Sequence, residues 1–155
     1  MFGLFRRKKT YPKLAPDSLT PVDAKISTAE AKKLYRRIMT DFGFYEDREE
    51  LAEGVEVLAD EMRSHTEGLQ AERDEHKQAI ADLKREIAEL EQNMKALEGE
   101  ALENAQAEVE VLEEDLVDAK TELEEAIKAL ADFKADKRAF LVDYINQETQ
   151  PPDDE

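Results

Sequence analysis

Apolar side chains recur along most of this chain at alternating steps of three and four residues. Such spacing places them on one stripe of a long helix and is typical of a coiled coil. The stripe changes phase near its middle, beside Gly99, because an unchanged register would put Asn104 and Glu108 into the core. The core positions of the predicted coiled coil include Leu83, Ile87, Leu90, Met94, Leu97, Val109, Leu112, Leu116, Leu123 and Leu130.

The phase change divides the pattern into two arms, which we expect over residues 47–97 and 101–147. Their lengths are nearly equal, so a turn at Gly99 would let each arm cover the apolar stripe of the other. One glycine costs a helix only about 1 kcal/mol relative to alanine, so a continuous rod that pairs with other chains is the alternative. Arm length favours the hairpin. The predicted fold is therefore all-α, a long coiled coil in two arms.

A short amphipathic helix and a turn are predicted over residues 28–45, before the arms. Ser27 and Glu30 fit a capping box at the start of this helix, and Gly43 supplies the backbone freedom that a C-cap uses. Asp47 then fits the N-cap of the first arm.

Both ends of the chain are expected to be flexible. Three prolines interrupt residues 1–27, which are basic and cannot continue as a helix. Residues 148–155 carry two more prolines and form an acidic tail.

Two histidines, His65 and His76, fall at apparent core positions of the first arm, together with Glu72. Isolated polar residues at such positions usually set the register and the number of partners. The alternative is a pH switch or a ligand set formed where several chains converge. We favour the register role and predict no metal and no cofactor.

The composition limits the class of protein. Charged residues make up 39% and aromatic residues 6% of the 155 residues, which favours long helices over a globular core. The absence of cysteine excludes disulfides, thiolate metal sites and a cysteine nucleophile. The sequence has neither an apolar run long enough to span a membrane nor a secretory signal. We expect a cytoplasmic protein, including a place at the inner face of a membrane or within a virion.

The net charge of −17 conceals a division along the chain. Residues 1–40 contain ten basic and three acidic side chains, whereas residues 41–155 contain twelve basic and 36 acidic ones. A basic end can bind an anionic surface while an acidic arm repels polyanions, which argues against nucleic acid as a partner.

The first nine residues place large apolar side chains directly before four cations. This opening is similar to the apolar and basic N-termini of bacterial peripheral membrane proteins, a resemblance that implies weak binding to an anionic bilayer. Docking into a groove of a protein partner is the alternative, and a start without a role is the third reading. The anchoring residues would be Phe2, Leu4, Phe5, Arg6, Arg7, Lys8 and Lys9.

The end of the second arm is more aromatic than the rest of the arm. In a hairpin these residues would return beside the start of the first arm and pack into a small knob, which is the favoured reading. In a rod they would stay exposed as a docking patch for a protein. The residues concerned are Phe133, Phe140, Leu141 and Tyr144.

Paired carboxylates are abundant, but acid and base catalysis needs a pocket that excludes water and raises one pKa. A solvated helix face has none, so we expect no enzyme. The first function hypothesis is a scaffold or adaptor that oligomerises through its coiled coil, with protein partners in a larger assembly and an N-terminal anchor. Its layout resembles coiled-coil hairpins that coat bacterial membranes. The alternative is a soluble structural subunit of a phage particle or of a secretion-type assembly.

Overall fold

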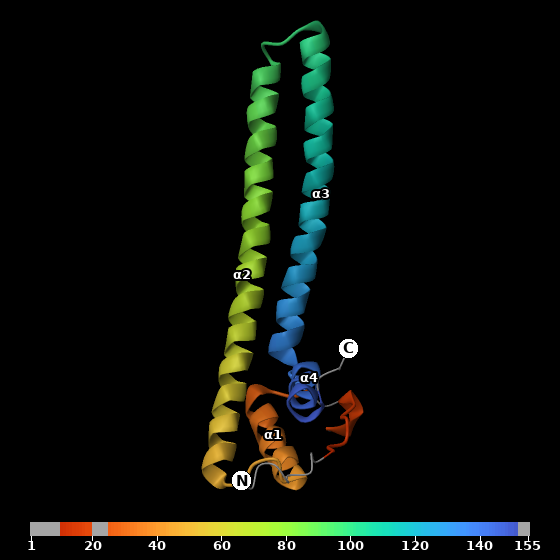
Figure 1. Cartoon of the computed structure of the whole chain (residues 1–155). Helices are drawn as coiled ribbons and strands as arrows, with labels where there is room; N and C mark the ends of the chain where they lie inside the picture. The colour runs from red at the N-terminus through yellow and green to blue at the C-terminus, as the bar shows by residue number, and fades with distance from the viewer. Residues whose placement is uncertain (1–9, 20–24, 152–155) are drawn as a thin grey trace. The chain divides into compact units, whose positions relative to one another are not determined.

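The computed structural model describes residues 10–19 and 25–151, and every regular element among them is helical. The predicted all-α class is confirmed. The anchoring residues Phe2 to Lys9 lie outside the described residues. The elements are η2 (Pro16–Ser18), α1 (Thr28–Phe42), α2 (Arg48–Met94), α3 (Gly99–Ala135) and α4 (Arg138–Thr149) (Figure 1).

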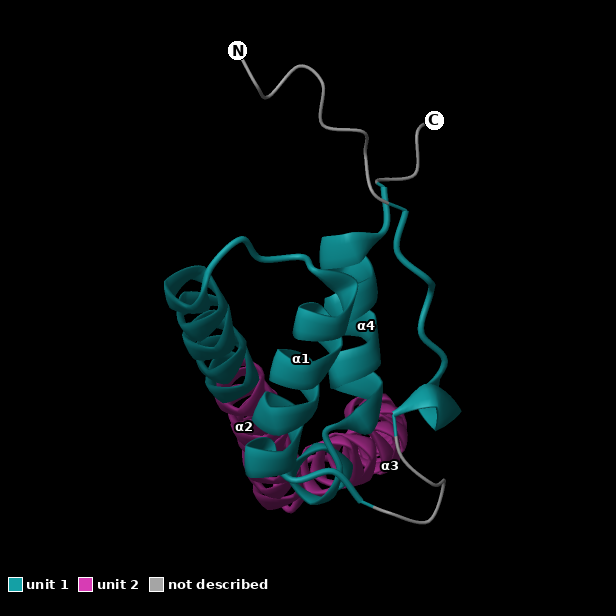
Figure 2. Ribbon diagram, turned by 90° about the horizontal axis from the view of Figure 1, so that it is seen from below, with its two compact units in different colours: residues 1–64, 132–155 teal, residues 65–131 magenta. Residues whose placement is uncertain are grey.

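The chain divides into two compact units (Figure 2). Unit 1 comprises residues 1–64 and 132–155, and unit 2 comprises residues 65–131. Unit 1 contains η2, α1, α4 and the outer ends of α2 and α3, while unit 2 contains the remainder of those two long helices.

In unit 2, α2 and α3 lie side by side (Figure 1). His76 Nδ1 on α2 is 3.6 Å from Glu122 Oε2 on α3, so the two helices approach within reach of their side chains. The buried residues of both helices recur at helical spacing, so each apolar stripe lies on the inner side of its helix. The buried residues of unit 2 are Ile80, Ile87, Ala105, Val109, Ala119, Ala126 and Leu130.

The two long helices are separated by a short connection over residues 95–98, so they do not form one continuous helix. The first arm ends at Met94, where the expected end was Leu97. Gly99 opens α3 with a φ of 62°, a left-handed conformation that side chains other than glycine disfavour. The glycine at the phase change is thus the residue that this connection requires.

Side-chain and backbone caps define both ends of α1, and of the predicted capping box the structure shows the Ser27 half. Ser27 Oγ accepts a hydrogen bond from the Glu30 amide at 3.2 Å. At the other end Gly43 has a φ of 61°, and its amide donates to Thr40 O at 2.9 Å while the next amide donates to Met39 O at 3.0 Å. This pair of bonds is a Schellman motif, which stops the helix and turns the chain.

Unit 1 is built by packing α1 against α4 (Figure 2). The positions of α1 that face inward recur at helical spacing, and α4 supplies an apolar face of its own. Leu58 and Met62 of α2 join this core. The buried residues of α1 and α4 are Ala31, Leu34, Tyr35, Ile38, Met39, Leu141, Val142 and Ile145.

The second arm is not continuous to residue 147 as expected, because the helix breaks between α3 and α4. Asp136 Oδ1 accepts hydrogen bonds from the amides of Ile26, at 2.9 Å, and Arg138, at 3.0 Å. The Lys137 amide donates to Ile26 O at 2.7 Å. Backbone groups from before α1 therefore replace the helical hydrogen bonds that the break removes.

The Lys137 side chain completes this corner. It is only 5% exposed, and its Nζ donates to Phe133 O at 2.5 Å and to Lys134 O at 3.2 Å. It also lies 4.4 Å from the centre of the Phe133 ring. Burial lowers the pKa of Lys137. A cation at the C-terminal end of α3 satisfies carbonyls that have no helical partner.

Residues 10–19 were expected to be a flexible linker, but the structure ties them to α4. The Leu14 amide donates to Asn146 Oδ1 at 2.9 Å, and Asn146 Nδ2 donates back to Leu14 O at 3.0 Å. An Arg138 guanidinium nitrogen donates to Pro16 O at 2.6 Å. Side chains of α4 thus pair with an extended backbone that has no strand beside it.

The aromatic end of the second arm is largely covered. Phe133 is 8% exposed and Leu141 is fully buried, while Phe140 and Tyr144 are half-buried. The ring centres of Phe133 and Phe140 are 5.4 Å apart, and those of Phe140 and Tyr144 are 6.1 Å apart. The exposed docking patch considered for these four residues is therefore wrong for Phe133 and Leu141, and the burial favours the packed knob.

Two glycines of α2 make a matched test of this packing. A Cβ built on Gly54 would lie 2.6 Å from Tyr45 Cζ, whereas a Cβ on Gly68 would meet nothing within 4 Å. We expect Gly68→Ala to raise the free energy of unfolding by about 1 kcal/mol, through helix propensity alone. We expect Gly54→Ala to lower it by about 1 to 2 kcal/mol, because the Tyr45 ring must move.

Urea denaturation of both variants measures the difference. An equal gain for Gly54→Ala and Gly68→Ala would contradict the packing of Tyr45 on this helix.

Candidate functional site

The most distinctive exposed feature of unit 1 is a set of cations on α1. Lys32, Lys33, Arg36 and Arg37 lie opposite the buried face of the helix, as its amphipathic pattern predicts. Lys32 is half-buried and the other three are exposed. Among the described residues, no carboxylate forms an ion pair with any of the four. These charges are available to a ligand.

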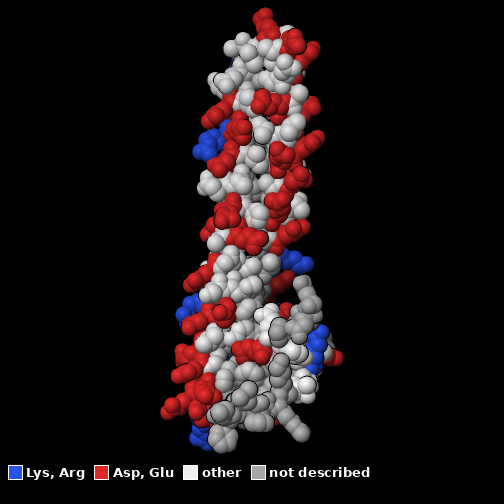
Figure 3. Space-filling model, in the orientation of Figure 1, with Lys and Arg blue, Asp and Glu red and all other residues white. Residues whose placement is uncertain are grey.

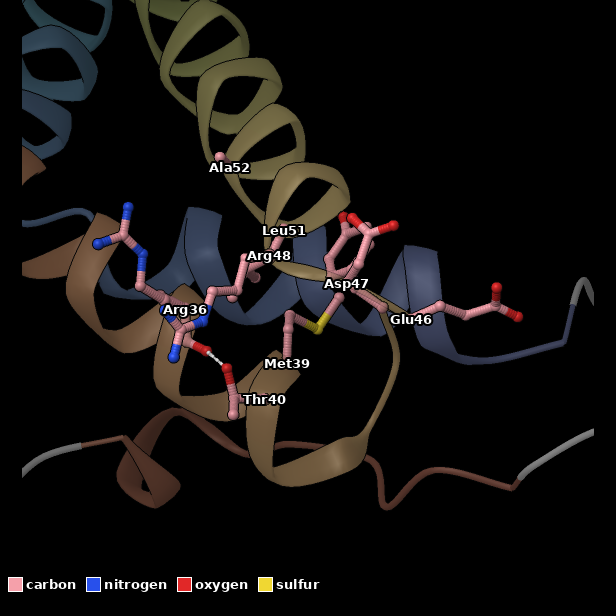
Figure 4. Close-up of a pocket in the computed structure, with 9 residues that line it drawn as sticks. Arg36, Met39, Thr40, Glu46, Asp47, Arg48, Leu51 and Ala52 are labelled. Atoms are coloured by element: carbon pink, nitrogen blue, oxygen red, sulfur yellow. Dashed lines mark hydrogen bonds between the residues drawn. The ribbon is translucent and has the colours of Figure 1, made fainter.

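A hollow of about 440 Å³ lies between α1 and the start of α2, beside these cations (Figure 4). Figure 4 shows Arg36, Met39 and Thr40 on the α1 side and Leu51 and Ala52 on the α2 side. Its lining is mainly apolar, with charges at the rim. The lining residues are Arg36, Met39, Thr40, Tyr45, Glu46, Asp47, Arg48, Leu51 and Ala52.

A second hollow of about 720 Å³ adjoins the first, since both are lined by Arg36 and Thr40. It carries the cations on one side and Val55 of α2 on the other. We call the two hollows together the α1–α2 groove. The second hollow is lined by Thr28, Ala29, Lys32, Lys33, Arg36, Arg37, Thr40, Asp41 and Val55.

Local structure holds the groove open. The C-cap at Gly43 turns the chain away from α1, and Asp47 Oδ1 then accepts from the Glu50 amide at 2.8 Å to start α2. Thr40 Oγ1 donates to Arg36 O at 2.6 Å, which fixes the Thr40 hydroxyl on the helix backbone (Figure 4).

Tyr45 forms one wall of the groove and is fixed from behind by a hydrogen-bonded chain. Tyr35 OH donates to Glu148 Oε2 at 2.8 Å. The Tyr45 and Tyr35 hydroxyls are 2.6 Å apart, so Tyr45 donates to Tyr35 once the Tyr35 proton points to Glu148. Tyr144 packs against Tyr35 with ring centres 5.9 Å apart. The wall is therefore anchored to α4.

Burial perturbs all three tyrosines of this cluster. The pKa of Tyr35 is raised far above its ordinary value of 10, first by desolvation and then by hydrogen bonds to Tyr45 and Glu148. Desolvation also raises the pKa of Tyr144, with Glu148 adding to the shift. The pKa of Tyr45 is raised mainly by desolvation. All three hydroxyls stay protonated well above neutral pH.

The α1–α2 groove combines two kinds of chemistry. Its cations can hold carboxylates or phosphates, and its apolar lining can receive aliphatic side chains. In residues 10–19 and 25–151 no three carboxylate or histidine side chains converge as a metal ligand set.

The two histidines differ in their surroundings. His65 is exposed, so its predicted core position is wrong. His76 is half-buried, with Nε2 4.0 Å from Glu72 Oε1 and Nδ1 3.6 Å from Glu122 Oε2. His76 therefore lies at the contact of α2 with α3, in keeping with a role in register.

The other charged surface is acidic. Residues 65–131 contain twenty acidic and seven basic side chains. Figure 3 shows carboxylates along the visible face of this unit, drawn in red. Few of these carboxylates form ion pairs in the described structure. One pair joins the exposed side chains of Arg85 and Asp82, and an exposed pair of this kind contributes little to stability.

Of the predicted coiled-coil core, Ile87, Val109 and Leu130 are buried. The other seven positions are half-buried, as one flank of a two-helix contact stays open to solvent. The α1–α2 groove was not predicted. Gly54 was the sequence signal for the groove, because the absence of a side chain there leaves room for the Tyr45 ring against α2.

The tyrosine cluster predicts a loss of stability at alkaline pH. A folded-state pKa above the unfolded value of about 10 means that the unfolded chain releases protons first as pH rises. Below about pH 10 these tyrosines leave the free energy of unfolding independent of pH. Above that pH, each tyrosine that stays protonated in the folded state lowers the free energy of unfolding by about 1.4 kcal/mol per pH unit. We expect Tyr35→Phe to reduce this slope in urea titrations between about pH 9 and 12.

The lowered pKa of Lys137 makes its effect on stability opposite in sign to that of the tyrosines. The test is therefore the difference in free energy of unfolding between the wild-type protein and Tyr35→Phe, to which Lys137 contributes equally in both proteins. Parallel stability curves for the two proteins would contradict a buried, protonated Tyr35.

No helix in the part of the chain that the structure describes combines the length and the apolar character that crossing a bilayer requires. Protein-family models, curated proteins and solved structures were compared with the chain, and none of them matches it.

Proposed function

We propose that the protein is a non-enzymatic scaffold or adaptor. Its two long helices act as an antiparallel coiled-coil hairpin, and unit 1 acts as the docking end. The N-terminal apolar and basic segment anchors the protein to a membrane surface or a larger assembly.

The observation that carries this proposal is the burial pattern of unit 2. Small or β-branched residues such as Ala105, Val109 and Ala119 are buried on α3, and Ile80 and Ile87 are buried on α2. Apolar stripes that cover each other within one chain leave an outer surface free for charge. Such a segment holds other groups apart and provides no enclosed chamber for chemistry.

Unit 1 supports the adaptor part of the proposal. The α1–α2 groove combines an apolar lining with cations that no carboxylate of residues 10–19 and 25–151 pairs. Interfaces of this kind gain orientation from charge and affinity from apolar anchors.

A distance measurement within one chain tests the hairpin. Spin labels at Lys77 and Thr121, beside the contact of His76 with Glu122, are expected about 10 to 20 Å apart. A continuous helix would separate them by about 66 Å. Labelled chains are diluted into unlabelled protein, so that only distances within a chain are recorded. Labels at Lys77 and Glu91, about 21 Å apart on α2, serve as the ruler.

Vesicle flotation tests the anchor. The intact protein is expected to float with vesicles of anionic lipid at low ionic strength, because cations and apolar side chains act together there. Removal of residues 1–9 abolishes the binding. Replacing Arg6 to Lys9 by glutamine weakens it, and replacing Phe2 and Phe5 by alanine weakens it independently of salt. An intact protein that stays with the soluble fraction contradicts the membrane anchor and leaves the assembly anchor.

A further inference from the structure

The cations of the α1–α2 groove form a regular array. Lys32 and Arg36 are four residues apart, as are Lys33 and Arg37, so the charges form two short rows along one helix face. Side chains at this separation are about 6 Å apart. The apolar lining of Met39, Leu51 and Val55 follows the rows. A fitting ligand therefore carries anions at about the same repeat beside small apolar groups.

The exposed face of α3 has this composition. Val117 is 63% exposed and Val111 is 56% exposed, which makes them the two most exposed large apolar residues among those described. The acidic side chain of Glu114 lies between them on the helix surface, and Glu110 and Asp118 extend the row in both directions. This face points away from the buried stripe of α3. We call it the acidic face of α3.

We propose that the α1–α2 groove binds the acidic face of α3 of a second copy of this chain. Glu110, Glu114 and Asp118 repeat every four residues, as the cations of α1 do. Rows of side chains at this spacing form the ridges that helices use to pack on each other. Opposite charges meet along the rows, and the valines enter the hollows beside Val55 and Leu51.

Charge complementarity selects this occupant. The chain has a net charge of −17, so two copies repel each other at long range. In the groove an acidic helix would meet a cluster of four cations on an otherwise acidic protein. The Debye length is about 10 Å at 0.1 M salt, so the long-range repulsion is screened there while direct ion contacts persist.

The contact joins two different surfaces, so one copy keeps a free acidic face and the other keeps a free groove. Such head-to-tail contacts build rings or open filaments rather than closed dimers. This inference rests on the proposed scaffold function, because it names the partner of the docking end. The distance measurement within a single chain tests the hairpin whether or not copies associate.

Sedimentation velocity of the full chain at increasing protein concentration tests the contact. The wild-type protein is expected to assemble beyond a dimer at about 0.1 M salt and to dissociate at about 1 M. The variant Arg36→Glu/Arg37→Glu places carboxylates of the groove opposite carboxylates of α3, and we expect the Kd of self-association to rise by about tenfold or more. The variant Glu114→Lys/Asp118→Lys opposes base to base and has the same effect.

A matched control separates this contact from general charge effects. Lys77→Glu/Lys84→Glu changes the net charge as much as the double arginine variant does, at exposed positions of α2 outside both surfaces. Its assembly is expected to equal that of the wild-type protein. Helix content from circular dichroism confirms that each variant is folded.

Mixing the two charge-reversed variants is the decisive measurement. Each variant alone repels itself, but the reversed groove of one fits the reversed face of the other, and their unchanged surfaces also fit. Assembly restored in the equimolar mixture supports the proposal. A wild-type chain that stays monomeric under these conditions overturns it. So does assembly that the two reversals leave unchanged, assembly that the control also loses, or a mixture that fails to reassemble.

Discussion

The shared hydroxyl of Tyr35 is the interaction on which the structure of unit 1 depends. Tyr35 is fully buried on α1, donates to Glu148 of α4 and accepts from Tyr45 of the connection to α2. The helix α1, the connection that follows it and the distant helix α4 thus meet at one oxygen. Burying such a group without a partner would cost about 1 to 3 kcal/mol, so this hydroxyl favours the arrangement in which the three segments are in contact. The wall of the α1–α2 groove is one consequence.

The same principle governs the corner between α3 and α4. A helix can end only where other partners satisfy its backbone groups. Here Asp136 and the backbone of Ile26 supply them, and the Lys137 ammonium caps the last carbonyls of α3. The ammonium is desolvated there at some cost, which the carbonyl oxygens and the Phe133 ring partly offset. The α4 helix can then lie on α1 rather than continue along α3.

Local signals made several features predictable. The caps at Ser27, Gly43 and Asp47 act within four residues, and each was recognisable from residue type and spacing alone. The helical stripes and the change at Gly99 were readable for the same reason. The break before Arg138 was not predictable, because the sequence there has neither glycine nor proline. Its cause is the contact with Ile26, 110 residues away. The pairing of Leu14 with Asn146 depends on an even longer separation, and the groove depends on Tyr45 lying against Gly54.

Charge and burial are divided differently between the two units, and this division explains why the groove stands out. In unit 2 the acids lie outside a thin apolar contact, where they oppose association of like surfaces and add little to stability. In unit 1 the cations of α1 lie above a thicker core that already satisfies the polar groups around it, including Tyr35 and Lys137. They are therefore not needed to neutralise buried acids. Four cations kept together without an ion-pair partner among the described residues, on a chain with nearly twice as many acids as bases, are most simply explained by a partner that is itself acidic.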